Sequence, residues 1–189
     1  MKTPRLSFYE LFYCFLLYGF IQTSATFAEA NSQNLIENRL SSILDQNTES
    51  IDLIETLLLI SKDWNPPLKE KPLRNEIDQL VTSVKNQLRP ESTSQETVDV
   101  LRRVIHHEKK YRYTDQVDDQ GIPINSDELF LHGMLKTKQG YCMNLSLLYL
   151  IIGDQLNLPL HGVGLPNHFF VRYGSGSDRI NIETTESGA

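Results

Sequence analysis

The hydrophobic pattern of this chain changes its period once, at a proline in the last third. Before Pro159, apolar residues recur every three to four positions, as on one face of an α-helix. After Pro159 they alternate with polar residues, as in β-strands that bury one face. Helices followed by strands predict an α+β fold, in which the C-terminal part forms a short antiparallel sheet.

Several segments before Pro159 are expected to be helices. The apolar positions predict helices at 35–44, 51–60, 73–88, 93–105, 125–136 and 142–156. Thr93 and Glu96 have the spacing of a capping box, and Asn157 can take the left-handed conformation that ends a helix. Residues 111–123 are polar and rich in turn formers, which predicts a loop.

The strands are expected at 160–165, 168–173 and 179–183. Residues 174–178 are mostly glycine and serine, which tolerate the backbone angles of a tight hairpin loop. The last two strands are therefore expected to be neighbours in the sheet.

The N-terminus is typical of a secretory signal peptide. A cationic start at 1–5 precedes the apolar stretch 6–21, and Ala28-Glu29-Ala30 has the small residues that signal peptidase requires. The alternative is a membrane anchor formed by 6–21. Glu10 opposes an anchor, because a carboxylate at the centre of a bilayer costs about 2.5–3.5 kcal/mol. We therefore expect an exported protein, periplasmic or secreted.

The charge of the chain bears on its partners. The net charge is −6, and residues 1–30 contribute nothing to it. Nucleic-acid binding needs a surplus of Lys and Arg to neutralise phosphates, so we expect no nucleic-acid partner. Contact with a membrane is expected only if 6–21 stays uncleaved. The pattern predicts no particular oligomeric state.

Removal of the leader would leave a single cysteine. Cys14 lies in the leader and Cys142 lies in the last third of the chain. One thiol excludes a fold held by intrachain disulfides. In an exported protein such a cysteine is buried and inert, paired with another molecule, or retained for its reactivity.

Three residues of the last third have the types that thiol catalysis requires. Cys142 is expected at the start of a helix, where the helix dipole favours a thiolate. His168 opens an expected strand, and Glu183 lies across the hairpin from it. They could serve as nucleophile, base and orienting acid, with the backbone N–H of Cys142 as an oxyanion donor. Taken singly, each residue also fits an ordinary structural role.

Two strings of residues resemble a known family. Residues 140–149, GYCMNLSLLY, and residues 156–172, LNLPLHGVGLPNHFFVR, are similar in this order to the SirB branch of the transglutaminase-like superfamily. The resemblance extends over residues 50–189. It implies a papain-like fold with Cys on a helix, His on a strand and an acid on the next strand. These positions correspond to Cys142, His168 and Glu183.

The chain departs from the family pattern in two ways. The acid of the superfamily is usually Asp, often followed by Pro, whereas this chain has Glu183 followed by Thr184. Asn181 shares the strand face and is a rival partner for the histidine. Relatives often continue further than this chain, so the chain is either a C-terminally truncated fragment or a domain that lacks part of its sheet. The expected organisation is a signal peptide at 1–30, a helical region at 31–118 and a transglutaminase-like core at 119–189.

Other sites are not expected. The chain has no phosphate-binding glycine loop and no acidic loop like the calcium site of animal transglutaminases, so we expect no cofactor. It has no HExxH motif and no second thiol after the leader, so we expect no metal site at His106, His107, His132 or His161. Ser146 lies inside an expected helix and lacks the strand–turn–helix context of a serine nucleophile.

The sequence therefore favours an exported transglutaminase-like cysteine protein. It would act on amide or peptide bonds of a protein or peptide substrate through a thioester, as a hydrolase or an acyl transferase. The alternative is a non-catalytic binding or scaffold module on the same fold, with Cys142 buried.

We expect intact-mass measurement of the exported protein to show the loss of residues 1–30, because the leader has a cleavage motif. Full-length mass recovered from the membrane fraction would instead support an anchor at 6–21.

Overall fold

The computed structural model describes Asn38, Ser42 and residues 52–166 and 168–188. Contacts divide the chain into two units, Met1–Ile51 and Asp52–Ala189, and nearly all described residues belong to the second. The expected leader, its anchor alternative at 6–21 and most of the expected helix at 35–44 lie outside the described residues. In the part that is described, no helix has both the length and the apolar character needed to cross a membrane.

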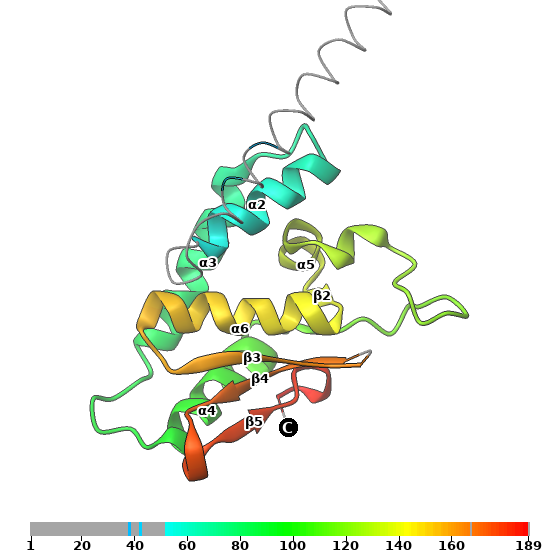
Figure 1. The fold of residues 1–189 in the computed structure, drawn as a ribbon. Coiled ribbons are helices and arrows are strands. Elements are labelled where there is room, and N and C mark those ends of the chain that lie inside the picture. Colours follow the sequence, from blue (N-terminus) through cyan, green and yellow to red (C-terminus); the bar gives the residue numbers. More distant parts are fainter. Residues whose placement is uncertain (1–37, 39–41, 43–51, 167, 189) are drawn as a thin grey trace, which may run out of the picture. The chain divides into compact units, whose positions relative to one another are not determined.

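The second unit combines helices with a small antiparallel sheet, which confirms the α+β prediction (Figure 1). Its helical elements are α2 (Leu53–Trp64), α3 (Glu70–Lys85), α4 (Ser94–Arg102), the π-helix η2 (Arg103–Glu108), the 3-10 helix η3 (Ser126–Leu129), α5 (Leu131–Thr137), α6 (Cys142–Leu156) and the 3-10 helices η4 (Gly176–Asp178) and η5 (Thr184–Glu186). Its strands are β1 (Arg112–Tyr113), β2 (Gln139–Gly140), β3 (Leu160–Leu165), β4 (His168–Tyr173) and β5 (Ile180–Ile182).

The sheet has the order β3-β4-β5, with both pairs antiparallel. Leu165 pairs with His168 at the tight end of the first hairpin, and Val171 pairs with Ile182 in the second. The predicted strands therefore form neighbouring hairpins, as expected. A separate parallel pair joins β1 to β2, directly before α6.

Helix α6 lies at the centre of the unit. It packs on the sheet on one side and contacts α3 on another (Figure 1). Its side chains are buried around most of its circumference, at Asn144, Leu145, Ser146, Leu148, Tyr149, Ile151, Ile152 and Gly153. A helix that is apolar nearly all round is stable only when it is covered on several sides. One hydrophobic core results, which joins α6 to α2, α3, α4 and the strands.

Local signals place the ends of several helices where the sequence predicts them. The Thr93 hydroxyl accepts from the Glu96 backbone N–H at 3.2 Å, and the Glu96 carboxylate accepts from the Thr93 N–H at 2.8 Å. This is the expected capping box. Asn157 ends α6 in the left-handed conformation, with φ of 53°. The turn that follows leads directly into β3.

The predicted helix at 125–136 is wrong in one respect, because it is broken at Phe130. Phe130 is extended, with φ −116° and ψ 156°, and its ring stacks on Trp64 at a centroid distance of 4.8 Å. The Trp64 indole N–H also donates to Asp127 at 2.9 Å, which gives Trp64 a packing role. Tertiary stacking outweighs helix propensity here, and the segment becomes η3 followed by α5.

The structure also differs from the helix predicted at 93–105. The α-helix ends at Arg102, and the chain goes on as the π-helix η2 to Glu108. After this wider turn, the Tyr111 N–H donates to the Ile105 carbonyl at 3.0 Å. Its own carbonyl contacts Nδ1 of the buried His106 at 2.7 Å. The segment at 111–123, predicted to be a loop, begins with the two-residue strand β1.

We expect Gly133→Ala to lower the free energy of unfolding by about 1–3 kcal/mol, as overpacking typically does. A Cβ at Gly133 would lie 2.0 Å from the Asp127 carbonyl oxygen, so η3 and α5 would have to separate. Urea denaturation measures the change. Gly164→Ala is the control, because a Cβ there meets only Phe169, at 3.9 Å. Equal stabilities of the two variants would contradict the prediction.

Candidate active site

Cys142 is the first residue of α6. Tyr141 before it is extended, so the helix begins at the cysteine without a side-chain cap. The thiol is free and partly buried. The N–H groups of the first helical turn have no partner inside the helix, so backbone donors surround this side chain.

His168 is the first residue of β4, and α6 packs on that strand. Cys142 and His168 line one open cleft of about 790 Å³. Its walls also include Gln120, Ile122, Tyr141, Met143, Gly164, Leu165 and Phe169. The structure thus brings these two predicted residues together.

Glu183 follows β5 and caps η5. Its Oε2 lies 2.6 Å from Nε2 of His168. Its Oε1 accepts from both the backbone N–H and the hydroxyl of Thr185, at 3.2 and 2.7 Å. Burial by itself would raise the pKa of Glu183, but the hydrogen bonds from Thr185 and His168 hold it below its usual value. The carboxylate is therefore ionised at neutral pH, and both of its oxygens are held.

The ionised carboxylate determines which nitrogen of His168 carries hydrogen. An ionised carboxylate only accepts, so Nε2 of the imidazole must be the donor in this 2.6 Å contact. The Nδ1 atom of the neutral ring is then an acceptor. His168 can take a proton at Nδ1 while Glu183 holds the other side of the ring.

The thiol of Cys142 differs from the sequence-based expectation. Burial raises the pKa of this thiol, and the nearby negative charge of Glu183 raises it further. Hydrogen bonds from the backbone N–H groups of Met143 and Phe169 lower it, but only in part. Desolvation therefore outweighs the helix N-terminus, and the resting group is a thiol.

Asn181, the rival partner for the histidine, points to a different group. Its Oδ1 accepts from Nε of Arg172 at 2.8 Å, across the β4–β5 pair. Among the described residues, the side chain hydrogen-bonded to His168 is Glu183. The extra methylene of Glu relative to Asp is thus accommodated.

Two supporting residues were missed by the sequence analysis. The Ser146 hydroxyl, one turn after Cys142, donates to the Phe169 carbonyl at 3.3 Å and lies 2.9 Å from the Thr184 hydroxyl. Both hydroxyl side chains are fully buried. These bonds tie the helix of Cys142 to the strand of His168 and to the residue after Glu183. A polar residue within the apolar stripe of α6 was the available signal for Ser146.

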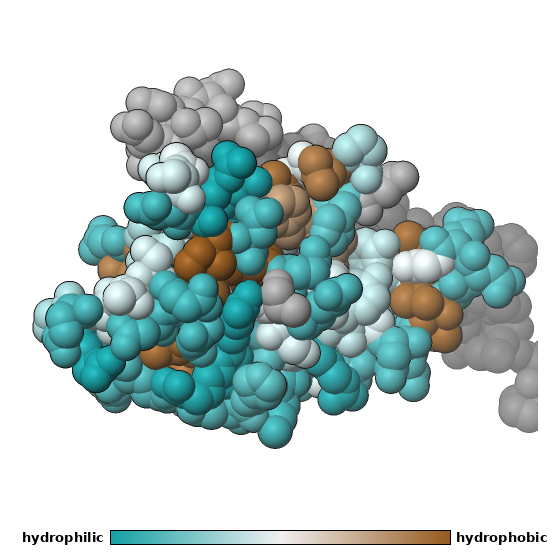
Figure 2. Space-filling model, turned by 90° about the horizontal axis from the view of Figure 1, so that it is seen from below, coloured by the Kyte–Doolittle hydropathy of each residue, from teal (hydrophilic) through white to brown (hydrophobic). Residues whose placement is uncertain are grey.

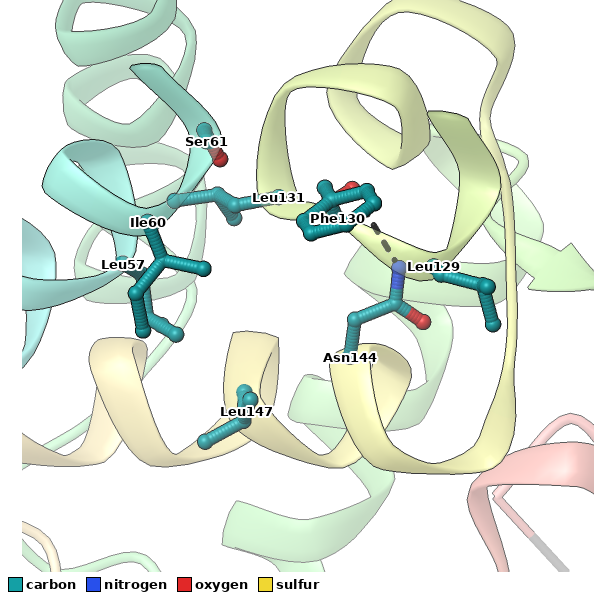
Figure 3. A pocket seen from close by; sticks show the side chains of 8 residues that line it. All are labelled: Leu57, Ile60, Ser61, Leu129, Phe130, Leu131, Asn144 and Leu147. Carbon is teal, nitrogen blue, oxygen red and sulfur yellow. Dashed lines mark hydrogen bonds between the residues drawn. The ribbon is translucent and has the colours of Figure 1, made fainter. Parts of the chain in front are cut away.

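Asn144 holds the first turn of α6 from the other side. Its Nδ2 donates to the Glu128 carbonyl at 2.6 Å. It also donates to the Phe130 carbonyl at 3.4 Å, the bond drawn in Figure 3. A cavity of about 40 Å³ lies here between α2, α5 and α6, lined mainly by leucine and isoleucine (Figure 3). Its size suits a water molecule rather than a substrate. The larger cleft at Cys142 and His168 is therefore the candidate active site.

The other histidines lie elsewhere. Burial lowers the pKa of His106 and of His132, and His161 is exposed on β3. Nε2 of His132 lies 3.6 Å from Asp127. Within residues 52–166 and 168–188, no group of three His, Cys, Asp or Glu side chains is placed to hold a metal ion.

Cys142 lies on a helix and His168 on a strand, as the resemblance implied, whereas Glu183 lies directly after the next strand instead of on it. Residues 71–189 match the family model of the transglutaminase-like superfamily. The chain belongs to this superfamily. The SirB branch within it stays a prediction.

Curated relatives match at low identity. F-box only protein 21 from Pongo abelii and from Homo sapiens are each 27% identical over 169 residues, which is 80% of this chain and 27% of theirs. A UPF0162 protein from Xylella fastidiosa strain Temecula1 is 28% identical over 137 residues, which is 71% of this chain and 45% of the relative. The chain thus spans less than half the length of these relatives. No solved structure matches it significantly.

Glu183→Gln should destabilise the protein near neutral pH, and the difference should shrink in acid. The folded state lowers the pKa of Glu183, so its ionised form stabilises the fold above its ordinary pKa of 4.5. This contribution is lost as the pH falls through the lowered pKa of the folded protein. Urea titrations of both proteins from about pH 3 to about pH 7 measure the difference.

Glu186→Gln is the matched control, because it removes the same charge from η5 and leaves the His168–Glu183 hydrogen bond in place. A destabilisation by Glu183→Gln that stays constant over the whole pH range would contradict the assigned ionisation.

Proposed function

We propose that this chain is an exported cysteine enzyme of the transglutaminase-like superfamily that cleaves or transfers amide bonds. One observation carries the proposal. Cys142 and His168 line the same cleft, and Glu183 is hydrogen-bonded to Nε2 of His168. This arrangement leaves Nδ1 as the proton acceptor for the thiol.

The first half of the reaction forms a thioester. The thiol proton passes to Nδ1 of His168 as the sulfur attacks the carbonyl carbon of a substrate amide. The backbone N–H of Cys142 donates to the oxygen that becomes negative. The carbon–nitrogen bond then breaks, and the amine leaves with the proton from His168.

The second half releases the acyl group. Water attacks the thioester carbonyl and gives a proton to Nδ1 of His168. The carbon–sulfur bond then breaks, and His168 returns that proton to the sulfur, which leaves a carboxylic acid and the free thiol of Cys142. An amine attacking in the same way would yield a new amide, so hydrolase and acyl transferase differ only in the second nucleophile. Every proton in this scheme moves between His168 and either Cys142, the substrate or the attacking nucleophile, so the scheme calls for no cofactor.

Supporting features favour an active site over an inert thiol. The Glu183 carboxylate is ionised and held by Thr185, so it can stabilise the imidazolium that forms during attack. The cleft is open to substrate. A protein or peptide substrate fits an exported chain, and the leader motif at 1–30 supports export.

A second candidate is a non-catalytic binding or scaffold module on the same fold. The observation in its favour is the partial burial of Cys142, which raises the pKa of the thiol. A buried cysteine commonly acts as a small hydrophobic residue.

We expect iodoacetamide to alkylate Cys142 of the purified domain at least about tenfold more slowly in His168→Ala than in the wild type, over about pH 5 to 9. The imidazole supplies the base that a thiol with a raised pKa needs. His161→Ala removes an exposed histidine from the neighbouring strand and should leave the rate unchanged. Cys142→Ala identifies the labelled site by mass.

Equal alkylation rates in the wild type and His168→Ala would show that His168 does not activate the Cys142 thiol. Full biological function of a folded Cys142→Ala variant would likewise reject the enzyme and leave the binding module.

A further inference from the structure

Large apolar side chains gather at the mouth of the cleft. Ile122, Met143 and Leu165 line it and are 40, 48 and 55% exposed. Figure 2 shows, on one face of the molecule, brown apolar patches within a largely hydrophilic surface. Exposed apolar residues that converge on one cleft mark a ligand-binding groove, whereas scattered ones carry no such meaning.

The cleft is lined largely by uncharged side chains although the chain is acidic, and the ionised carboxylate of Glu183 lies behind His168. The nine described residues that line the cleft include no Asp, Glu, Lys or Arg, while the whole chain carries a net charge of −6. The polar groups that line it are Gln120, Tyr141, Cys142 and His168. A charged substrate group buried here would lose its hydration without gaining an ion-pair partner among these side chains.

The wall that carries Ile122 is a formed hairpin. Val117 and Pro123 pair as an antiparallel bridge at its base. The Asp118 carboxylate accepts from the backbone N–H groups of Gln120 and Ile122, each at 2.9 Å. The apolar side of the cleft is therefore built before substrate arrives, which reduces the entropy lost on binding.

Gly164 leaves unfilled space within the cleft. A Cβ at this position would meet only Phe169 Cδ2, at the ordinary contact distance of 3.9 Å. Its φ is not among the positive values of the chain, so the backbone can carry a side chain without strain. The neighbouring Gly162 differs, because a Cβ there would lie 2.6 Å from the Phe169 ring. The space at Gly164 thus belongs to the cleft and not to packing within the sheet.

We propose that this cleft selects amide substrates with a neutral, apolar side chain next to the scissile bond, and that the space left by Gly164 receives that side chain. Ile122, Met143 and Leu165 provide the apolar contacts. The inference rests on the proposed function, since it names the substrate class of the same site.

The test uses chloromethyl ketones of N-acyl leucine, glycine, aspartate and lysine, which alkylate a reactive cysteine with loss of chloride. Rates of Cys142 labelling are followed by intact mass. In the wild type, the leucyl probe should label about tenfold or more faster than the aspartyl and lysyl probes, the range that apolar pockets provide.

Gly164→Leu should fill the space and slow the leucyl probe about tenfold or more, with little effect on the glycyl probe or on iodoacetamide. Gly164→Ala should have a smaller effect in the same direction. His161→Leu adds an apolar side chain to the exposed part of the same strand and should change none of the rates. Thermal unfolding of each variant verifies the fold.

Equal labelling rates of the wild type by the leucyl, aspartyl and lysyl probes would overturn the proposed preference for apolar side chains. Equal slowing of the leucyl and glycyl probes by Gly164→Leu would overturn the role of Gly164. Either result is compatible with the proposed function as long as iodoacetamide labelling still depends on His168. Loss of that dependence overturns the proposed function itself.

Discussion

The burial of α6 is the constraint on which the rest of this structure depends. A helix that is apolar around most of its circumference must be covered by the sheet on one side and by other helices elsewhere. Hydrophobic burial has no preferred direction, so it does not by itself fix the rotation or height of the helix. Hydrogen bonds from two polar side chains of α6 fix its rotation and height. Ser146 bonds to Phe169 and Thr184, and Asn144 bonds to Glu128. Cys142 is thereby held beside β4.

Burial and hydrogen bonding act in opposite directions on the candidate active site. Desolvation keeps Cys142 as a thiol, whereas hydrogen bonds from Thr185 and His168 keep Glu183 ionised despite its partial burial. The resting thiol then shares the cleft with His168, whose Nε2 is held by the Glu183 carboxylate. In the proposed reaction, charge separation would occur during attack rather than before it. The fixed carboxylate of Glu183 would then stabilise the imidazolium when it forms.

Much of the secondary structure follows from local signals. The capping box at Thr93 and the left-handed Asn157 mark helix ends through contacts within a few residues, and the change of period at Pro159 separates helices from strands. The breaks at Phe130 and Arg102 were not predictable. The break at Phe130 accompanies the stacking of its ring on the distant Trp64, a contact that local propensity does not encode.

The sequence alone determined the α+β class, the order of the elements and the three residue types that thiol chemistry needs, because periodicity and motifs are local properties. Only the tertiary structure decided that the partner of His168 is Glu183 and not Asn181, since hairpin register sets which side chains meet. It also decided that Cys142 rests as a thiol, because desolvation depends on what covers the side chain. The cleft likewise is lined by residues far apart in the chain, which meet only when it folds.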